Sequence, residues 1–243
     1  MEISKYENDL IQSLKTVVDS IISENPKLNI AVTKGERVGD AISKFLEINF
    51  VKNTNNHSFF SNAEQSPSGA TKNPWDARVN YTINNFTQDI WLDFKAVNVD
   101  NEDTNPDSGT PDKIIDHIIS NNFYLVFIYV YYKGANNSLD FVQVDGEYVK
   151  PYFLKNINKS FRITPANQMQ VNGMAKPEYR TREEFLNLLL TKKIESNRRK
   201  FKKAETELIN LEQGYFKKTA SREIRLEDLL DLNKLQEATI NKL

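Results

Sequence analysis

Apolar residues near the amino end of the chain recur every three or four positions, as they do in a helix that buries one face. The stripe consists of Leu10, Leu14, Val17, Val18, Ile21 and Ile22. It predicts an amphipathic helix over residues 3–24, which Pro26 would end. The same spacing predicts a second helix that begins near Gly35.

A β-hairpin is predicted next, after a loop over residues 53–74 that is rich in Asn, Ser, Pro and Gly. Apolar and polar side chains alternate over residues 77–83 and again over residues 89–97. This alternation is typical of strands that bury one face. Asn84 and Asn85 stand between the two strands and suit a tight turn.

The rest of the pattern predicts an α/β fold in which a central sheet has helices on both sides. Residues 123–132 form an unbroken run of apolar and aromatic residues, which favours a central strand covered on both faces. Thr181 and Glu184 form the Thr-x-x-Glu pattern of a helix start, and this helix should continue to about Leu211. The other expected elements are a polar loop over 98–110, a short helix around 114–119, strands near 139–144 and 147–154, and a helical segment over 221–242.

Length and composition limit the class of protein. The 243 residues suit one large domain with an appendage, here expected as residues 1–213 and a helical extension over residues 214–243. The chain has no cysteine, which excludes disulfides and thiolate metal sites. No apolar run approaches the roughly twenty residues that span a bilayer, so a soluble, cytoplasmic protein without a membrane partner is expected.

The charge is nearly balanced, at −1, which counts mildly against a nucleic-acid partner. The distribution is uneven, because residues 93–112 are acidic and a later segment is basic. The basic residues are Lys192, Lys193, Arg198, Arg199, Lys200, Lys202 and Lys203. They could bind phosphates beside a cation-holding site, or they could form an ordinary solvated helix face.

The candidate chemistry lies on the predicted hairpin. Asp93 and Lys95 are two residues apart on a strand, so their side chains share one face roughly 7 Å apart. Pairing of the hairpin would bring Asp76 to the same polar face. Two carboxylates can hold Mg²⁺, which acidifies a water, and a lysine can stabilise the charge that develops in phosphodiester cleavage. Glu36, at a helix start, is a candidate third carboxylate; the alternative to a catalytic site is a surface salt bridge between Asp93 and Lys95.

Several stretches resemble the type II restriction endonucleases of the PD-(D/E)xK superfamily, in the EcoRV/HincII-like branch. The hairpin stretch is PWDARVNYTINNFTQDIWLDFKAV, and the loop and helix after it are NPDSGTPDKIIDHI. The third stretch is QMQVNGMAKPEYRTREEF, which resembles a DNA-reading segment followed by a capped helix. Within the branch, the chain is similar to rare-cutting enzymes for an A·T-rich palindrome, over roughly residues 1–210.

The resemblance implies a restriction-endonuclease-like core and a homodimer around double-stranded DNA that is cut to blunt ends. Asp76 and Asp93 match the metal-binding carboxylates for Mg²⁺, Lys95 matches the motif lysine, and Glu36 matches the upstream helical acid. Trp75 separates Pro74 from Asp76, so the literal Pro-Asp pair is missing. Other nucleases of this fold, for repair or junction cleavage, and a DNA-binding module without catalysis remain alternatives.

Candidate DNA-binding residues lie in three places. Gln168, Gln170 and Asn172 alternate with apolar residues, so on a strand their amides would face one way, and such amides pair with adenine in the major groove. An ordinary polar strand face would look the same. The other candidates are Asn167, Arg78, Asn98, Asn105, Ser108, Thr110, Arg180 and Arg182. His57 and His117 lack the spacing of a metal site and are interpreted as structural.

Overall fold

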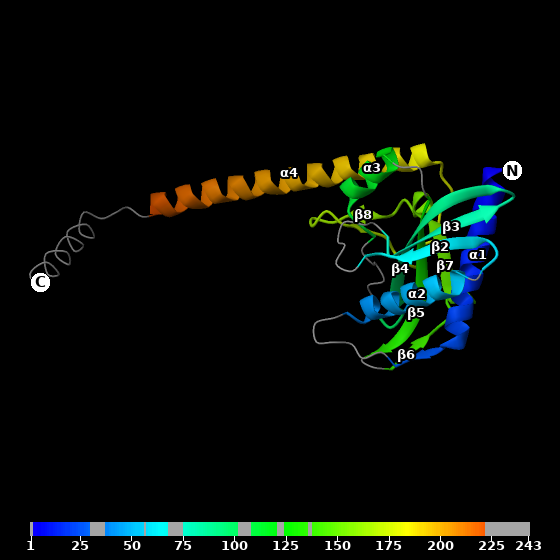
Figure 1. The fold of residues 1–243 in the computed structure, drawn as a ribbon. Coiled ribbons are helices and arrows are strands. Elements are labelled where there is room, and N and C mark those ends of the chain that lie inside the picture. The colour runs from blue at the N-terminus through cyan, green and yellow to red at the C-terminus, as the bar shows by residue number, and fades with distance from the viewer. Residues whose placement is uncertain are drawn as a thin grey trace, which may run out of the picture. The chain divides into compact units, whose positions relative to one another are not determined.

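The computed structural model describes residues 2–29, 37–55, 57–67, 75–101, 108–120, 124–135 and 138–221. The chain forms two compact units, residues 1–193 and 194–243. The first unit is a mixed α/β fold (Figure 1), as the sequence predicts. None of the helices in these residues combines the length and the apolar character needed to cross a membrane.

One mixed sheet organises the first unit, with seven strands in its described residues. The strands are β1 (Lys27–Leu28), β2 (Phe60–Gln65), β3 (Ala77–Ile83), β4 (Phe86–Asn98), β5 (Tyr124–Ala135), β6 (Ser138–Phe141) and β7 (Val149–Phe153). Their order is β1-β6-β5-β4-β3-β2, and β7 also pairs with β5. The hairpin of β3 and β4 is antiparallel, whereas β4 and β5 run parallel, so β4 lies inside the sheet.

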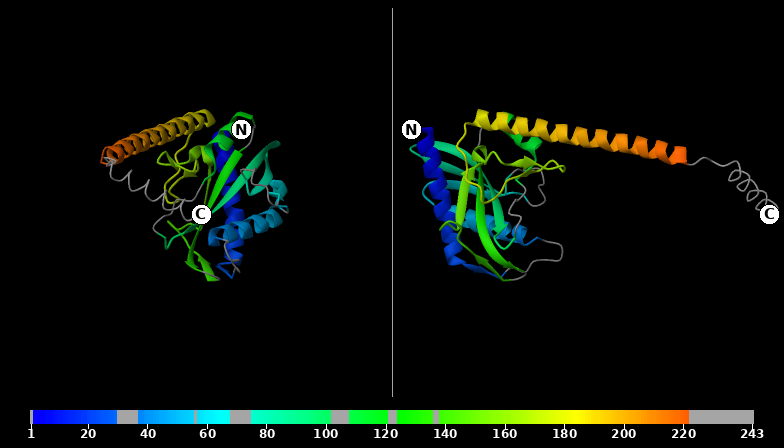
Figure 2. Two further views of the ribbon diagram at one scale, coloured as in Figure 1. Left: turned by 90° about the vertical axis from the view of Figure 1, so that its left-hand side faces the viewer. Right: turned by 180° about the vertical axis from the view of Figure 1, so that it is seen from behind.

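Helices α1 (Ile3–Glu24) and α2 (Val38–Thr54) cover one face of this sheet (Figure 2). The predicted stripe on α1 is buried, and the helix ends at Asn25, directly before Pro26. α1 and α2 share one hydrophobic cluster with alternate residues of the central strands, among them Leu92 and Ile128. This burial of one apolar stripe is what fixes both helices against the sheet.

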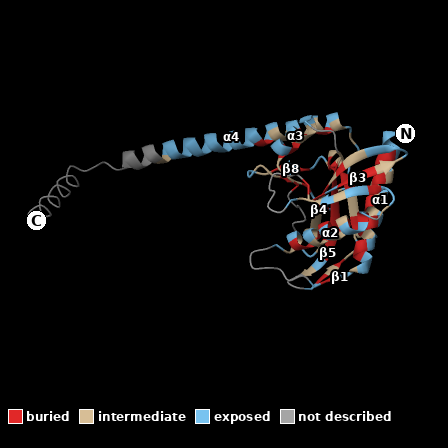
Figure 3. Cartoon of the chain, viewed as in Figure 1, coloured by how far each residue is buried: buried red, intermediate tan, exposed pale blue. Residues whose placement is uncertain are grey.

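The opposite face carries a second cluster built from the intervening residues of β5, including Phe127, Tyr129 and Tyr131. It is covered by α3 (Pro111–Ser120), the 3₁₀ turn η1 (Leu154–Asn156), the ribbon of β8 (Arg162–Ile163) and β9 (Met169–Gln170), and the start of α4 (Arg182–Ser221). Figure 3 shows the buried residues concentrated in the sheet and in the elements beside it. The prediction that this central strand is covered on both faces is confirmed.

Turn and cap signals in the sequence are also confirmed. Asn84 and Asn85 have φ of 51° and 63°, the left-handed conformation of a tight hairpin turn that asparagine tolerates. At the start of α4, the N–H of Thr181 donates to Glu184 Oε2 at 2.7 Å, and the N–H of Glu184 donates to Thr181 Oγ1 at 3.2 Å. These reciprocal bonds are the capping box that the sequence indicates.

The structure differs from the sequence-based prediction at three elements. β2 lies in the segment predicted as a loop, because this edge strand buries little besides Phe60 and so lacks a clear alternation. The predicted strand of the DNA-reading segment is only Met169–Gln170 long. α4 continues to Ser221, ten residues beyond the predicted end, and nearly all of the predicted helix over 221–242 lies outside the described residues.

Candidate active site

Asp93 and Lys95 lie on the face of β4 that points away from α1 and α2. The strand buries Ile90, Leu92 and Phe94 in the cluster on the other side, so strict alternation puts the acid and the lysine together. Lys95 Nζ is 2.6 Å from Asp93 Oδ1, and the two side chains are 20% and 14% exposed. The alternative of an ordinary surface salt bridge does not fit a pair this enclosed.

Asp76 is attached to the same strand by its backbone and by its side chain. Its N–H donates to the carbonyl of Leu92 at 2.7 Å, and its Oδ2 accepts the N–H of Phe94 at 2.8 Å. At the start of β3, the Asp76 side chain therefore replaces a backbone carbonyl as the acceptor for an N–H of β4. This arrangement brings the first acid beside Asp93, as the hairpin prediction required, and the two carboxylates interact.

The electrostatics of the three groups are those of acids held close together away from water. Burial raises the pKa of the Asp93 carboxyl to about 7, because the nearby ammonium of Lys95 offsets burial only in part and the charge of Asp76 adds to it. Burial by itself would lower the pKa of Lys95, but the charges of Asp93 and Asp76 outweigh it and raise that pKa. A second cation beside the carboxylates would favour their ionised form.

The donors fit a hard divalent cation. Asp93 Oδ1 is buried, and its close contact with Lys95 lacks hydrogen-bond geometry, so the described residues leave this oxygen without a hydrogen-bond partner. A buried acceptor of this kind is a natural ligand for Mg²⁺, which prefers carboxylate oxygens and keeps several waters. Asp76 and Asp93 lie close enough to interact and would be the protein ligands of such an ion. The described residues contain no group of three or more His, Asp or Glu that could hold a metal.

Aromatic side chains line the pair from β5. Lys95 Nζ lies 5.9 Å from the centre of the Phe127 ring, and burial raises the pKa of the neighbouring Tyr129. Tyr129 stacks on Tyr152 at 5.4 Å between ring centres, and its hydroxyl is 3.5 Å from Ser108 Oγ. Ser108 is buried in this position, and its predicted contact with DNA stays a prediction.

Sequence reasoning missed a further acid near the site, Glu47 on α2. Its side chain is buried and bonded to Lys44, with Nζ to Oε1 at 3.1 Å. Burial raises the pKa of Glu47, and the charge of Asp76 raises it further while Lys44 opposes the shift. Glu47 follows Leu46 of the apolar stripe directly, so its helix position could have suggested burial, but no spacing rule links it to Asp76.

Two residues of the predicted motif lie outside the described residues. These are Glu36, the predicted upstream acid, and Pro74. The helix nearest to it in the described residues is α2, which begins at Val38. Its role as a third carboxylate stays a prediction.

The three amides predicted to read DNA share one face, but each is bonded to another group of the chain. Met169 and Val171 are buried, so Gln168, Gln170 and Asn172 do face the other way, as alternation requires. Each amide makes a contact within the chain: Gln170 Oε1 accepts from Arg162 at 3.1 Å, Gln168 Nε2 donates to Thr110 Oγ1 at 3.2 Å, and Asn172 Oδ1 accepts the N–H of Met174 at 2.8 Å. Asn167 Nδ2 donates to Asp112 at 2.8 Å.

The remaining DNA-binding candidates are spread over both ends of the unit. Arg78 is paired with Asp89 at 2.8 Å on the polar face of the hairpin. Arg180 and Arg182 donate to the carbonyls of Ile157 and Ile118, and Asn98 Oδ1 accepts the N–H of Asp100. Asn105 lies outside the described residues. Of the basic segment, Lys193 is bonded to Asp112.

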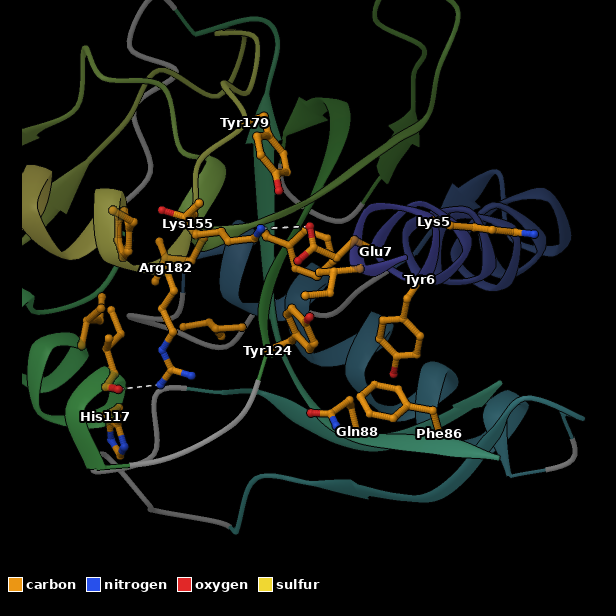
Figure 4. A pocket seen from close by; sticks show the side chains of 18 of the residues that line it. Lys5, Tyr6, Glu7, Phe86, Gln88, His117, Tyr124, Lys155, Tyr179 and Arg182 are labelled. Atoms are coloured by element: carbon orange, nitrogen blue, oxygen red, sulfur yellow. Dashed lines mark hydrogen bonds and ion pairs between the residues drawn. The ribbon is translucent and has the colours of Figure 1, made fainter. Parts of the chain in front are cut away.

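A pocket of about 980 Å³ lies elsewhere on the first unit, between α1, α3, β4 and the start of α4 (Figure 4). Its wall includes the ion pair of Lys155 with Glu7, at 2.9 Å, and the bond of Arg182 to the Ile118 carbonyl. His117 lines the pocket and packs its ring edge-on to Trp91. Asp76, Asp93 and Lys95 are not among the lining residues, so this pocket is separate from the acids.

PD-(D/E)xK nucleases share one arrangement of fold and site. In a mixed sheet, an inner strand presents an acid and a lysine two residues apart, and a further acid lies at the start of the neighbouring strand. The sequence comparison narrows this class. Residues 2–211 match the model of the SwaI-like family, the SwaI restriction endonucleases. The match covers most of the chain, which therefore belongs to this family of DNA-cutting enzymes. No curated protein matches the chain.

Proposed function

We propose that the chain is a Mg²⁺-dependent, site-specific endonuclease that cuts both strands of an A·T-rich palindrome to blunt ends, acting as a homodimer. One observation carries the proposal: the Asp76 carboxylate is anchored on the Phe94 N–H, next to the enclosed pair of Asp93 and Lys95. Membership of the family supports double-stranded DNA as the substrate.

The residues divide the reaction between them. Water attacks the phosphorus, the bond to the 3′ oxygen breaks, and that oxygen takes up a proton, which leaves a 5′-phosphate and a 3′-hydroxyl. Asp76 and Asp93 would hold Mg²⁺, which when bound acidifies a water and stabilises negative charge on phosphate. Lys95, fixed by Asp93, places a point charge where the phosphate becomes more negative. The aromatic wall at Phe127 and Tyr129 keeps bulk water away from this charge.

We also infer that Glu47 is the third acid of the site; the alternative is the predicted Glu36, which lies outside the described residues. Glu47 is buried on α2 and is close enough to Asp76 for the two charges to interact. In this role it would hold a water or a second ion. The interaction of its carboxyl with Asp76 supports the assignment, and Lys44 balances its charge when no metal is bound.

Digestion of a large DNA of known sequence tests the proposal. The protein is incubated with the DNA in Mg²⁺ and in EDTA, and both 5′ ends of every product are sequenced. Discrete fragments that need Mg²⁺ and end flush within one A·T-rich palindrome support the proposal. Smears or structure-dependent nicks would indicate a repair or junction nuclease, staggered ends would reject blunt cutting, and intact DNA in Mg²⁺ would reject catalysis.

The same assay tests Glu47. Glu47→Gln keeps the size of the side chain and its bond to Lys44 but removes the charge, so cleavage should fall while Glu36→Gln cuts normally. The reverse result would return the role to Glu36.

A further inference from the structure

The helix of the second unit carries an apolar seam that no described residue covers. Four large apolar side chains of α4 lie mostly in solvent: Ile194, Phe201, Leu208 and Leu211, which are 52%, 70%, 57% and 71% exposed. They recur at spacings of seven and three, and Asn197 and Ala204 occupy the remaining positions of the same repeat. A repeat of 3.5 residues is the signature of a coiled-coil seam rather than of a helix packed on a sheet.

Other surfaces of the chain offer less for self-association. The apolar stripe of α1 is buried in the core beside the sheet and is not available to a second copy. Between residues 194 and 211 the α4 seam is interrupted by one polar residue, Asn197. An isolated helix that exposes such a stripe gains little stability from propensity alone. Large apolar side chains in a row on a surface indicate an interaction site.

We propose that residues 194–211 of α4 pair with the same residues of a second copy as an antiparallel coiled coil. The charges beside the seam select this direction. In the antiparallel register Phe201 meets Ala204 of the second copy, and the flanking positions then place Arg198 opposite Glu205 and Lys200 opposite Glu207. Symmetry repeats each pair, so all four flanking contacts are between opposite charges.

A parallel pair would use the charges less well. In that direction Lys200 would meet Glu205 of the second copy, but Glu207 would meet Glu212, which is repulsive. The cause is the segregation of charge along the helix, where basic residues precede acidic ones. Within one copy, Glu207 is 3.7 Å from Lys203 in a largely exposed pair, which is too loose to hold it away from a partner.

The seam itself also distinguishes the two directions. Antiparallel pairing places Phe201 against the small Ala204 in two central layers, and Ile194 against Leu211 in two outer layers. Parallel pairing would stack Phe201 on Phe201 and Ala204 on Ala204, which gives one overfilled and one underfilled layer. Asn197 works against the antiparallel register, because it meets Leu208 there and would meet its own copy in a parallel pair.

A matched pair of substitutions tests the seam in the full-length chain, without DNA or Mg²⁺. Ile194→Ser removes a seam residue, whereas Ile209→Ser makes the same change at an exposed isoleucine that lies off the seam. Sedimentation velocity should show a dimer whose dissociation constant rises about tenfold or more for Ile194→Ser and changes little for Ile209→Ser. Equal effects of the two changes would overturn the proposal.

Charge exchange tests the flanking contacts. One variant carries Arg198→Glu and Lys200→Glu, and the other carries Glu205→Lys and Glu207→Lys. Each variant should be monomeric alone, and an equal mixture should regain the dimer, because every contact in the mixed pair joins opposite charges. A mixture that stays monomeric would contradict these contacts.

Cysteine pairing tests the direction, since the natural chain has no cysteine to interfere. Asn197→Cys and Leu208→Cys variants should form a disulfide only when mixed, because residue 197 of one copy lies beside residue 208 of the other. Crosslinking of either variant with itself would show a parallel pair and refute the antiparallel one.

A natural chain that stays monomeric also overturns the proposal, whether residues 222–243 or another protein then covers the seam. None of these readouts depends on cleavage, so failure here and failure of the proposed nuclease function are separable. A dimer formed only on DNA, with both serine variants unaffected, would keep the nuclease proposal and reject the coiled coil.

Discussion

Asp93 is placed where a carboxylate is costly to keep. It is mostly enclosed, it stands beside a second acid, and its pKa is raised to about 7, so its ionised form is disfavoured relative to an aspartate in water. Ionisable groups held in such surroundings cluster at functional sites. The cost is therefore best understood as serving the binding of a ligand or substrate, and membership of a restriction endonuclease family points to DNA as that substrate.

The first prediction concerns the reacting groups. Asp93→Ala and Lys95→Ala should each lower cleavage by at least about 10²-fold, because the first removes a proposed ligand of Mg²⁺ and the second removes the positive charge proposed to act at the phosphate. Folding should persist, as judged by circular dichroism, because both side chains lie outside the hydrophobic clusters. Asp89→Asn, on the same polar face of β4, is the control and should cut nearly normally. Near-normal cutting by Asp93→Ala or Lys95→Ala would reject the assignment.

A partly buried aspartate outside the candidate site, Asp19 on α1, predicts how stability depends on pH. Burial raises the pKa of Asp19, Lys15 opposes the shift, and Asp19 Oδ1 has no hydrogen-bond partner in the described residues. Because the folded chain holds this proton more tightly than the unfolded chain, Asp19 lowers stability as pH rises through its pKa. Asp19→Asn should therefore raise the melting temperature at pH 7. The gain should vanish below the ordinary aspartate pKa, and a gain that is equal at every pH would contradict this.

At the scale of elements, short sequence motifs predicted correctly those turns and helix ends that depend on neighbouring residues. The capping box at Thr181, the turn at Asn84 and the helix before Pro26 each depend on a few neighbouring residues, and all three are confirmed. β2 and the short β9 depend on partners far along the chain, so their own patterns carry little information. The end of α4 was underestimated because a solvated helix lacks an apolar boundary.

The capping box supplies the third prediction. Thr181→Ala removes the acceptor for the Glu184 N–H and should lower the free energy of unfolding by about 1 kcal/mol. Urea denaturation measures this change. Thr181→Ser keeps the hydroxyl and should restore most of the stability, and a serine variant as unstable as the alanine variant would contradict the capping role.

The β8–β9 ribbon carries the fourth prediction. Gln170→Ala should weaken discrimination between the target and one-base variants by about 1–3 kcal/mol, the size of one bidentate contact with a base. To contact a base in this way, the Gln170 amide must give up its hydrogen bond to Arg162. Arg162→Ala removes that bond and is therefore measured beside Gln170→Ala. Competition cleavage of matched and altered sites measures the ratio. Unchanged discrimination would remove Gln170 from the reading residues.

At the scale of the whole molecule, the sequence indicated the layers and the proximity of Asp76, Asp93 and Lys95, because the alternation on β3 and β4 fixes both the core and the polar face. It could not show that Glu47 approaches Asp76, since that contact depends on how α2 lies across the sheet. It also could not show that Ser108 is buried, because burial there comes from β5 and β9.

Metal binding provides the fifth prediction. A Mg²⁺ ion held by Asp76 and Asp93, as proposed, would bind the folded chain and not the unfolded one, so Mg²⁺ should raise the melting temperature in the absence of DNA. The expected gain is about 1.4 kcal/mol when the free ion is ten times its Kd. Chelation with EDTA should reverse it, and Asp93→Ala should abolish it. An equal gain in that variant would place the metal elsewhere.

The bond from the Phe94 N–H to Asp76 has a practical consequence for mutational work. An alanine at position 76 would remove a proposed metal ligand and, at the same time, leave the Phe94 N–H of the neighbouring strand without its acceptor. Loss of cutting in such a variant would mix two defects, one chemical and one structural. Asparagine retains an oxygen that can accept the Phe94 N–H. If Asp76→Asn does not cut DNA, the loss of cleavage can therefore be attributed to the missing charge.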